Sequence, residues 1–120
     1  MAAVALVGLE RGLADLVEAG LRGEGHAVAR VPLDAGTVRA LGRRRPDAVV
    51  LDGHAYANTR VLLTDLRAQP ATAELPVVLL GPARPAEVPH FEVMERLGRA
   101  FELDALLAAV RRALGATYTG

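Results

Sequence analysis

Short apolar runs alternate along this chain with segments in which apolar residues recur at helical spacing. The runs lie at residues 2–7, 27–31, 48–51 and 76–80, with a weaker one at 93–97. Apolar runs of this length, bounded by polar or turn residues, are typical of strands buried on both faces of a parallel sheet. We therefore predict five strands, with 27–31 at an edge of the sheet because its apolar and polar residues alternate only weakly.

Helical periodicity fills the spaces between these runs. Leu13, Leu16, Val17 and Leu21 define a first helix, which Gly23 and Gly25 are expected to end. A second helix is predicted over residues 35–44, with Asp34 as its N-cap and with Val38 and Leu41 facing inward.

The second half of the chain continues the pattern. A third helix is predicted over residues 59–68, and it should bury Leu62, Leu63 and Leu66. Three prolines at 82, 85 and 89 mean that any helix in residues 83–90 is short or distorted. The last helix carries one apolar stripe, formed by Leu103, Leu106, Leu107, Val110 and Leu114.

This alternation of strands and helices predicts an α/β fold. More specifically, we expect a three-layer α/β/α sandwich of flavodoxin-like type, with a five-stranded parallel sheet of order 2-1-3-4-5. Residues 1–114 should form this single domain and residues 115–120 a flexible C-terminal tail. Asp52 ends the third strand run, so it should emerge at the carboxyl edge of the sheet, where open α/β sheets place their ligands and chemistry.

Composition excludes several functions. The chain has 14 basic and 14 acidic residues with no block of one sign, which argues against capture of nucleic acid or anionic membranes. It contains no cysteine, serine or lysine, so serine and cysteine nucleophiles are absent and we expect no enzyme. The three histidines are scattered, which predicts no metal site. No apolar run approaches the ~20 residues that span a bilayer, and we expect a soluble, cytoplasmic protein.

Several segments, in order and at near-family spacing, resemble the receiver domains of two-component response regulators over nearly the whole chain. The matching segments are 4–7, 24–28, 45–52, 65–80 and 99–107. The resemblance implies a flavodoxin-like fold in which Asp52 stands at the phospho-accepting position. That family also supplies an acidic pair for Mg²⁺, a hydroxyl and a lysine around the aspartate, because positioning and electrostatics provide most of the catalysis of phosphoryl transfer.

This sequence departs from the family at most of those positions. The acidic pair falls on Gly8 and Leu9, with Glu10 next to them, and the hydroxyl position falls on Gly81. His54 occupies the position that lends only its backbone carbonyl to the metal.

Two further family positions lie near the last predicted strand. The lysine position falls on Arg99, and the aromatic switch position on Arg96. We expect Arg99 to pair with Asp52 directly, because a guanidinium can hold a carboxylate through two hydrogen bonds without a metal. We expect no cofactor and no firmly bound Mg²⁺.

The interpretation that follows is a degenerate receiver domain that acts as a protein-interaction module in two-component or phosphorelay signalling, independently of phosphorylation. Its partner would be another signalling protein, such as a histidine kinase or an output protein, or a second copy in a homodimer. Two alternatives stay open at this point. One is an atypical receiver that does accept phosphate on Asp52, and the other is a small-ligand binder of flavodoxin-like fold.

Overall fold

A computed structural model of the chain describes residues 2–52, 56–81, 95–97 and 102–118, and it leaves out the side chains of 56–60, 95–97 and 116–118. The strands are β1 (Ala3–Val7), β2 (Ala27–Val31), β3 (Ala48–Asp52), β4 (Val77–Leu80) and β5 (Glu95–Leu97). They form one five-stranded sheet of order β2-β1-β3-β4-β5, in which every neighbouring pair is parallel. This is the predicted order, with β2 at an edge as expected.

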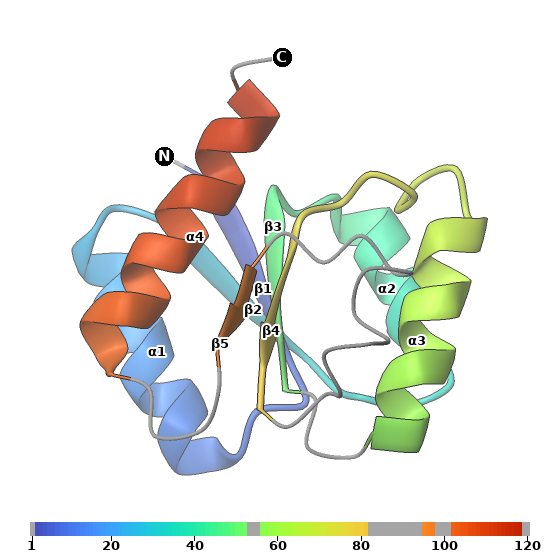
Figure 1. The fold of residues 1–120 in the computed structure, drawn as a ribbon, viewed down its shortest axis with the longest axis horizontal. Coiled ribbons are helices and arrows are strands. Elements are labelled where there is room, and N and C mark those ends of the chain that lie inside the picture. Colours follow the sequence, from blue (N-terminus) through green and yellow to red (C-terminus); the bar gives the residue numbers. More distant parts are fainter. Residues whose placement is uncertain (1, 53–55, 82–94, 98–101, 119–120) are drawn as a thin grey trace.

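Helices cover both faces of the sheet (Figure 1). α1 (Arg11–Gly23) and α4 (Leu103–Tyr118) lie on one face, and α2 (Thr37–Arg44) and α3 (Tyr56–Ala68) on the other. Because successive strand residues point to opposite faces, β1 supplies Val4 and Leu6 to the first layer and Ala5 and Val7 to the second. The result is two separate apolar cores, one on each face of a sheet whose central strands β3 and β4 are fully buried.

Most of the predicted inward-facing positions are confirmed. Leu62, Leu63 and Leu66 of α3 are buried, Leu41 of α2 is buried, and Val38 packs half-buried against the same core. Leu16 of α1 is the exception, since 52% of its surface is exposed. Ala14, which the periodicity did not single out, is buried on the inward face of α1 together with Val17 and Leu21.

The start of α2 differs from the prediction. The helix begins at Thr37 with Gly36 as its N-cap, and the predicted cap, Asp34, lies two residues earlier. The Asp34 carboxylate accepts a hydrogen bond of 2.7 Å from the Gly36 amide, which forms a side-chain turn ahead of the helix. The buried Thr37 hydroxyl donates to the Pro32 carbonyl at 2.6 Å and thereby ties the helix to the end of β2.

Two other helices extend beyond their predicted boundaries. α3 begins at Tyr56, three residues before the predicted start, and α4 continues to Tyr118, past the predicted end of the domain at Leu114. Glycine within a helix lowers its stability by only about 1 kcal/mol relative to alanine, so α4 can continue through Gly115. The predicted distortion of residues 83–90 and the first two residues of the predicted fifth strand lie outside the described residues.

Arg67 and Thr72 organise the connection between α3 and β4. One Arg67 guanidinium nitrogen, Nη1, donates to the carbonyls of Thr72, Ala73 and Leu75 at 3.3, 3.0 and 2.9 Å. The Thr72 hydroxyl, which is buried, donates to the Leu66 carbonyl at 2.7 Å. Side chains therefore donate hydrogen bonds to backbone carbonyls of this connection, which has no strand or helix partners to do so.

Replacing Thr72 by valine keeps the shape of the side chain and removes its hydroxyl. We expect this variant to lose about 1 kcal/mol of unfolding free energy, because the Leu66 carbonyl loses its shorter hydrogen bond and keeps only the one from the Gln69 amide at 3.4 Å. Urea denaturation followed by circular dichroism measures the difference. A variant with an unchanged denaturation midpoint would show that this hydrogen bond does not contribute to stability.

Within the described residues, no helix is both long enough and apolar enough to cross a membrane.

Candidate functional site at the carboxyl edge of the sheet

Asp52 is the last residue of β3 and lies at the carboxyl edge of the sheet, as predicted. It is in register with Leu80 of β4, and only 7% of its surface is exposed. β1 and β4 flank β3, so the chain leaves all three strands at the same edge. A carboxylate in this place is close to the turns that follow β1 and β4, and the chemistry of the site depends on what those turns carry.

The turn after β1 holds the three residues assigned to the acidic pair and its neighbour. Gly8 has a φ of +73°, a left-handed conformation that residues with a side chain rarely adopt. Leu9 packs against the core beneath α1 and α4. The Glu10 carboxylate caps α1 and accepts a hydrogen bond of 3.0 Å from the Gly12 amide.

The turn after β4 has a similar backbone feature. Gly81, at the position of the family's hydroxyl, is buried and has a φ of +96°. A threonine is strongly disfavoured at such a φ because its branched Cβ meets the backbone. At Gly8 a Cβ would lie 3.2 Å from Cδ2 of Leu33, which is tighter than ordinary contact. Both turns are therefore shaped for glycine and not for a side chain that reaches toward Asp52.

Of the remaining predicted site residues, the structure describes only the backbone of Arg96. Arg96 lies in β5, in register with Leu79, but its side chain is not described. His54 and Arg99 lie outside the described residues, so the expected pairing of Arg99 with Asp52 stays a prediction. Among the residues that are described, no three histidine, aspartate or glutamate side chains gather closely enough to hold a metal ion.

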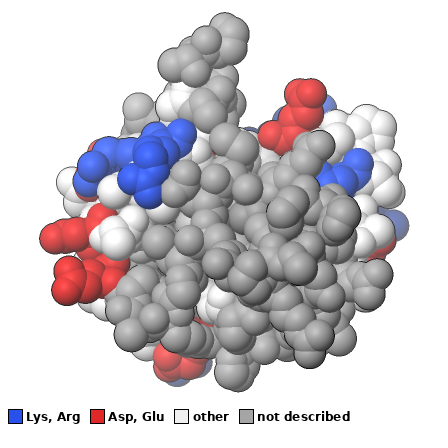
Figure 2. All heavy atoms as spheres, in the orientation of Figure 1, with Lys and Arg blue, Asp and Glu red and all other residues white. Residues whose placement is uncertain are grey.

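Ion pairs at the surface link α1 to β2 and to α4. Arg30 donates to Asp15 at 2.6 Å and to Glu18 at 2.8 Å, and Arg22 also donates to Glu18. Hydrogen bonds from Arg22 and Arg30 hold the pKa of Glu18 below its ordinary value, and a hydrogen bond from Arg111 does the same for Glu24. On the face drawn in Figure 2, acidic and basic side chains stand near one another over both helical layers.

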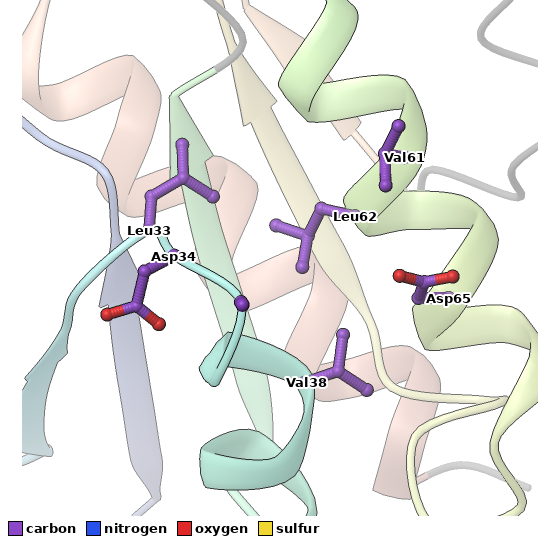
Figure 3. A pocket seen from close by; sticks show the side chains of 7 residues that line it. Leu33, Asp34, Val38, Val61, Leu62 and Asp65 are labelled. Atoms are coloured by element: carbon purple, nitrogen blue, oxygen red, sulfur yellow. The ribbon is translucent and has the colours of Figure 1, made fainter.

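A hollow of about 430 Å³ opens between α2, the loop before it and α3. Sequence reasoning missed it. Its lining residues are Leu33, Asp34, Ala35, Val38, Val61, Leu62 and Asp65 (Figure 3). The signal that was available is Val61, an apolar residue that falls off the inward-facing pattern of Leu62, Leu63 and Leu66.

No protein-family model matches this sequence, and no curated protein matches it. Solved structures do match its fold. The receiver domain of the signal transduction histidine kinase from Syntrophus aciditrophicus superimposes with a TM-score of 0.80 at 21% identity, covering 100% of this chain and 95% of its own. The receiver domain of the sensor histidine kinase PA1611 from Pseudomonas aeruginosa, with a magnesium ion in its active site cleft, gives 0.75 at 25% identity, covering 95% and 98%.

This chain has the fold of a response-regulator receiver domain. NtrX from Brucella abortus, solved with ADP, matches with a TM-score of 0.79 at 27% identity over 97% of this chain, which spans only 26% of NtrX. The structural neighbours are thus receiver domains of two-component signalling proteins, as the resemblance implied. Within the receiver fold, β3 places Asp52 at the carboxyl edge, and the turns beside it carry Gly8, Leu9 and Gly81.

Proposed function

We propose that this chain is a degenerate receiver, a non-enzymatic module that binds another signalling protein without phosphorylation of Asp52. The observation that carries the proposal is the pair of left-handed glycines, Gly8 and Gly81, that flank Asp52 at the carboxyl edge. Phosphoryl transfer to a carboxylate depends on groups that offset the charge of the transferring phosphate. Here the backbone of both turns disfavours the side chains that would supply those groups.

The fit of Mg²⁺ is poor for the same reason. Mg²⁺ is usually held by one or two carboxylates together with waters and phosphate oxygens. Glu10, the carboxylate in the turn after β1, already caps α1, and its neighbour Leu9 is a half-buried apolar residue that packs against the core. The magnesium bound by the PA1611 receiver domain is therefore not carried over to this chain.

A mass measurement tests the proposal. We expect no gain of a phosphoryl group when the protein is incubated with acetyl phosphate and Mg²⁺ and its intact mass is recorded. A phosphorylatable receiver domain treated in parallel serves as the positive control. A stable gain of one phosphoryl group that Asp52→Asn abolishes would overturn the proposal and establish the chain as an atypical phospho-accepting receiver.

A further inference from the structure

The hollow between α2 and α3 is the central part of a longer groove. A second hollow of about 550 Å³ shares Ala35, Val38 and Asp65 with the first and extends it toward the carboxyl ends of both helices. We call the exposed rim of this groove the seam face and define it by Leu33, Val38, Arg39, Val61 and Asp65. In Figure 3, Val61 and Asp65 stand on α3 and Val38 stands on α2, across the hollow.

The seam face exposes apolar surface that the fold does not use. Val61 is 61% exposed, and in the part of the chain that the structure describes only Leu16 is another large apolar side chain with more than half of its surface exposed. Val38 and Leu33 are half-buried on the same rim. Single exposed apolar residues are ordinary, but several that line one hollow are typical of a surface that binds a partner.

Opposite charges stand on the two sides of this apolar strip. Asp65 lies on α3 and Arg39 on α2, both line the second hollow, and both are exposed. Neither forms an ion pair with any residue in the described parts of the chain. The face therefore carries an acid and a base on opposite helices, and both line the second hollow.

Such an arrangement is complementary to itself. α2 and α3 each follow a strand of one parallel sheet and lie on the same face, so they run in the same direction. A two-fold axis along the groove places α2 of one copy over α3 of the other. Arg39 of each copy then faces Asp65 of the other, and Val38 and Val61 meet between the two charge pairs.

We propose that the seam face is where two copies of this chain associate. The inference rests on the proposed function, since it names the surface and one partner of a module that acts by binding. α3, with 13 residues, spans about 20 Å. Two helices of roughly 10 Å width give a contact smaller than a standard specific interface, so we expect a weak dimer that forms only at high protein concentration.

Sedimentation velocity over protein concentrations from micromolar to near-millimolar tests the site. The wild type is expected to shift from monomer to dimer, and Val61→Asp to weaken the association about tenfold or more, because it places an unpaired charge in the contact. Leu16→Asp is the matched control: it puts the same charge on the other exposed apolar residue and leaves the association unchanged. A protein that stays monomeric throughout, or a dimer indifferent to Val61→Asp, would overturn the proposal.

Charge reversal tests the geometry. Arg39→Asp and Asp65→Arg should each weaken self-association about fivefold, because like charges then face one another in the homodimer. Mixing the two variants should restore dimers, since each mixed dimer has both pairs of opposite charge. Native mass spectrometry distinguishes the mixed dimer, and its failure to form in excess over the two homodimers would rule out the two-fold arrangement.

The two proposals fail in different ways. Phosphorylation of Asp52 in the mass experiment would overturn the degenerate function while leaving the sedimentation result unaffected. A protein that is not phosphorylated and also stays monomeric would overturn only the proposal for the seam face.

Discussion

Replacing Leu66 by alanine is expected to lower the unfolding free energy by about 3–4 kcal/mol, since the lost burial and the cavity left behind both count against the folded state. Leu66 is completely buried in the core between the sheet and the helices α2 and α3. The same core contains strand residues fixed by pairing on both sides, such as Val49 and Leu79, so the site has little freedom to collapse. Urea denaturation of the variant measures the loss.

Val61→Ala on the same helix is the control. Its side chain is 61% exposed, so we expect a change within about 0.5 kcal/mol. Equal losses for the two variants would contradict the orientation of α3, because they would mean that the two residues are buried to the same extent.

Introducing an acid at the first position of the family's acidic pair, Gly8→Asp, is expected to cost about 2 kcal/mol of stability. The aspartate would have to adopt the φ of +73° that Gly8 has, and its Cβ would lie 3.2 Å from Cδ2 of Leu33. Thermal and urea denaturation report the cost. Calorimetric titration with Mg²⁺ reports whether the added carboxylate recruits the metal, and we expect no measurable binding.

Gly23→Asp is the matched substitution for this test. A Cβ at Gly23 meets nothing within 4 Å, and Gly23 has no positive φ, so the expected loss is about 0.5 kcal/mol or less. A Gly8→Asp variant that is as stable as the wild type and binds Mg²⁺ would contradict the view that the conformation of the turn after β1 disfavours a metal-binding carboxylate.

The strands were predictable because a doubly buried strand needs an unbroken apolar run, and runs such as 48–51 and 76–80 have few other uses in a short chain. The order of the sheet followed from the alternation of five strands with helices, which is typical of the flavodoxin-like arrangement, together with the preference for right-handed crossovers. Periodicity also identified the buried faces of α3 and α4 correctly. These features depend on many residues that agree with one another, and a single misplaced residue does not change them.

Features set by single residues were predicted less well. Asp34 has the side chain of an N-cap, but a competing turn at Gly36 moved the start of α2 by two residues. Leu16 has helical spacing with Leu13, yet it lies off the face of α1 that buries Ala14, Val17 and Leu21, and it is half-exposed. Local patterns state which conformations are available, and tertiary packing chooses among them.

The candidate site divides in the same way. The position of Asp52 at the end of β3 followed from the apolar run before it. Glu10 caps α1 through its side chain, and Gly8 and Gly81 adopt left-handed backbone conformations. The residue types permit these features but do not specify them. The seam face depends on two helices that are adjacent only in the folded chain, so the sequence points to it only through Val61, the apolar residue that falls off the inward-facing pattern of α3.

The most direct measurement is a titration of the isotopically labelled protein with Mg²⁺ and beryllofluoride, followed by two-dimensional NMR of the backbone amides. Beryllofluoride mimics an aspartyl phosphate, so it reports on whether Asp52 and its surroundings can hold one. We expect the amides of Asp52, Gly8 and Gly81 not to shift on addition of both reagents. Saturable shifts at these amides that require both reagents, and that Asp52→Asn removes, would contradict it.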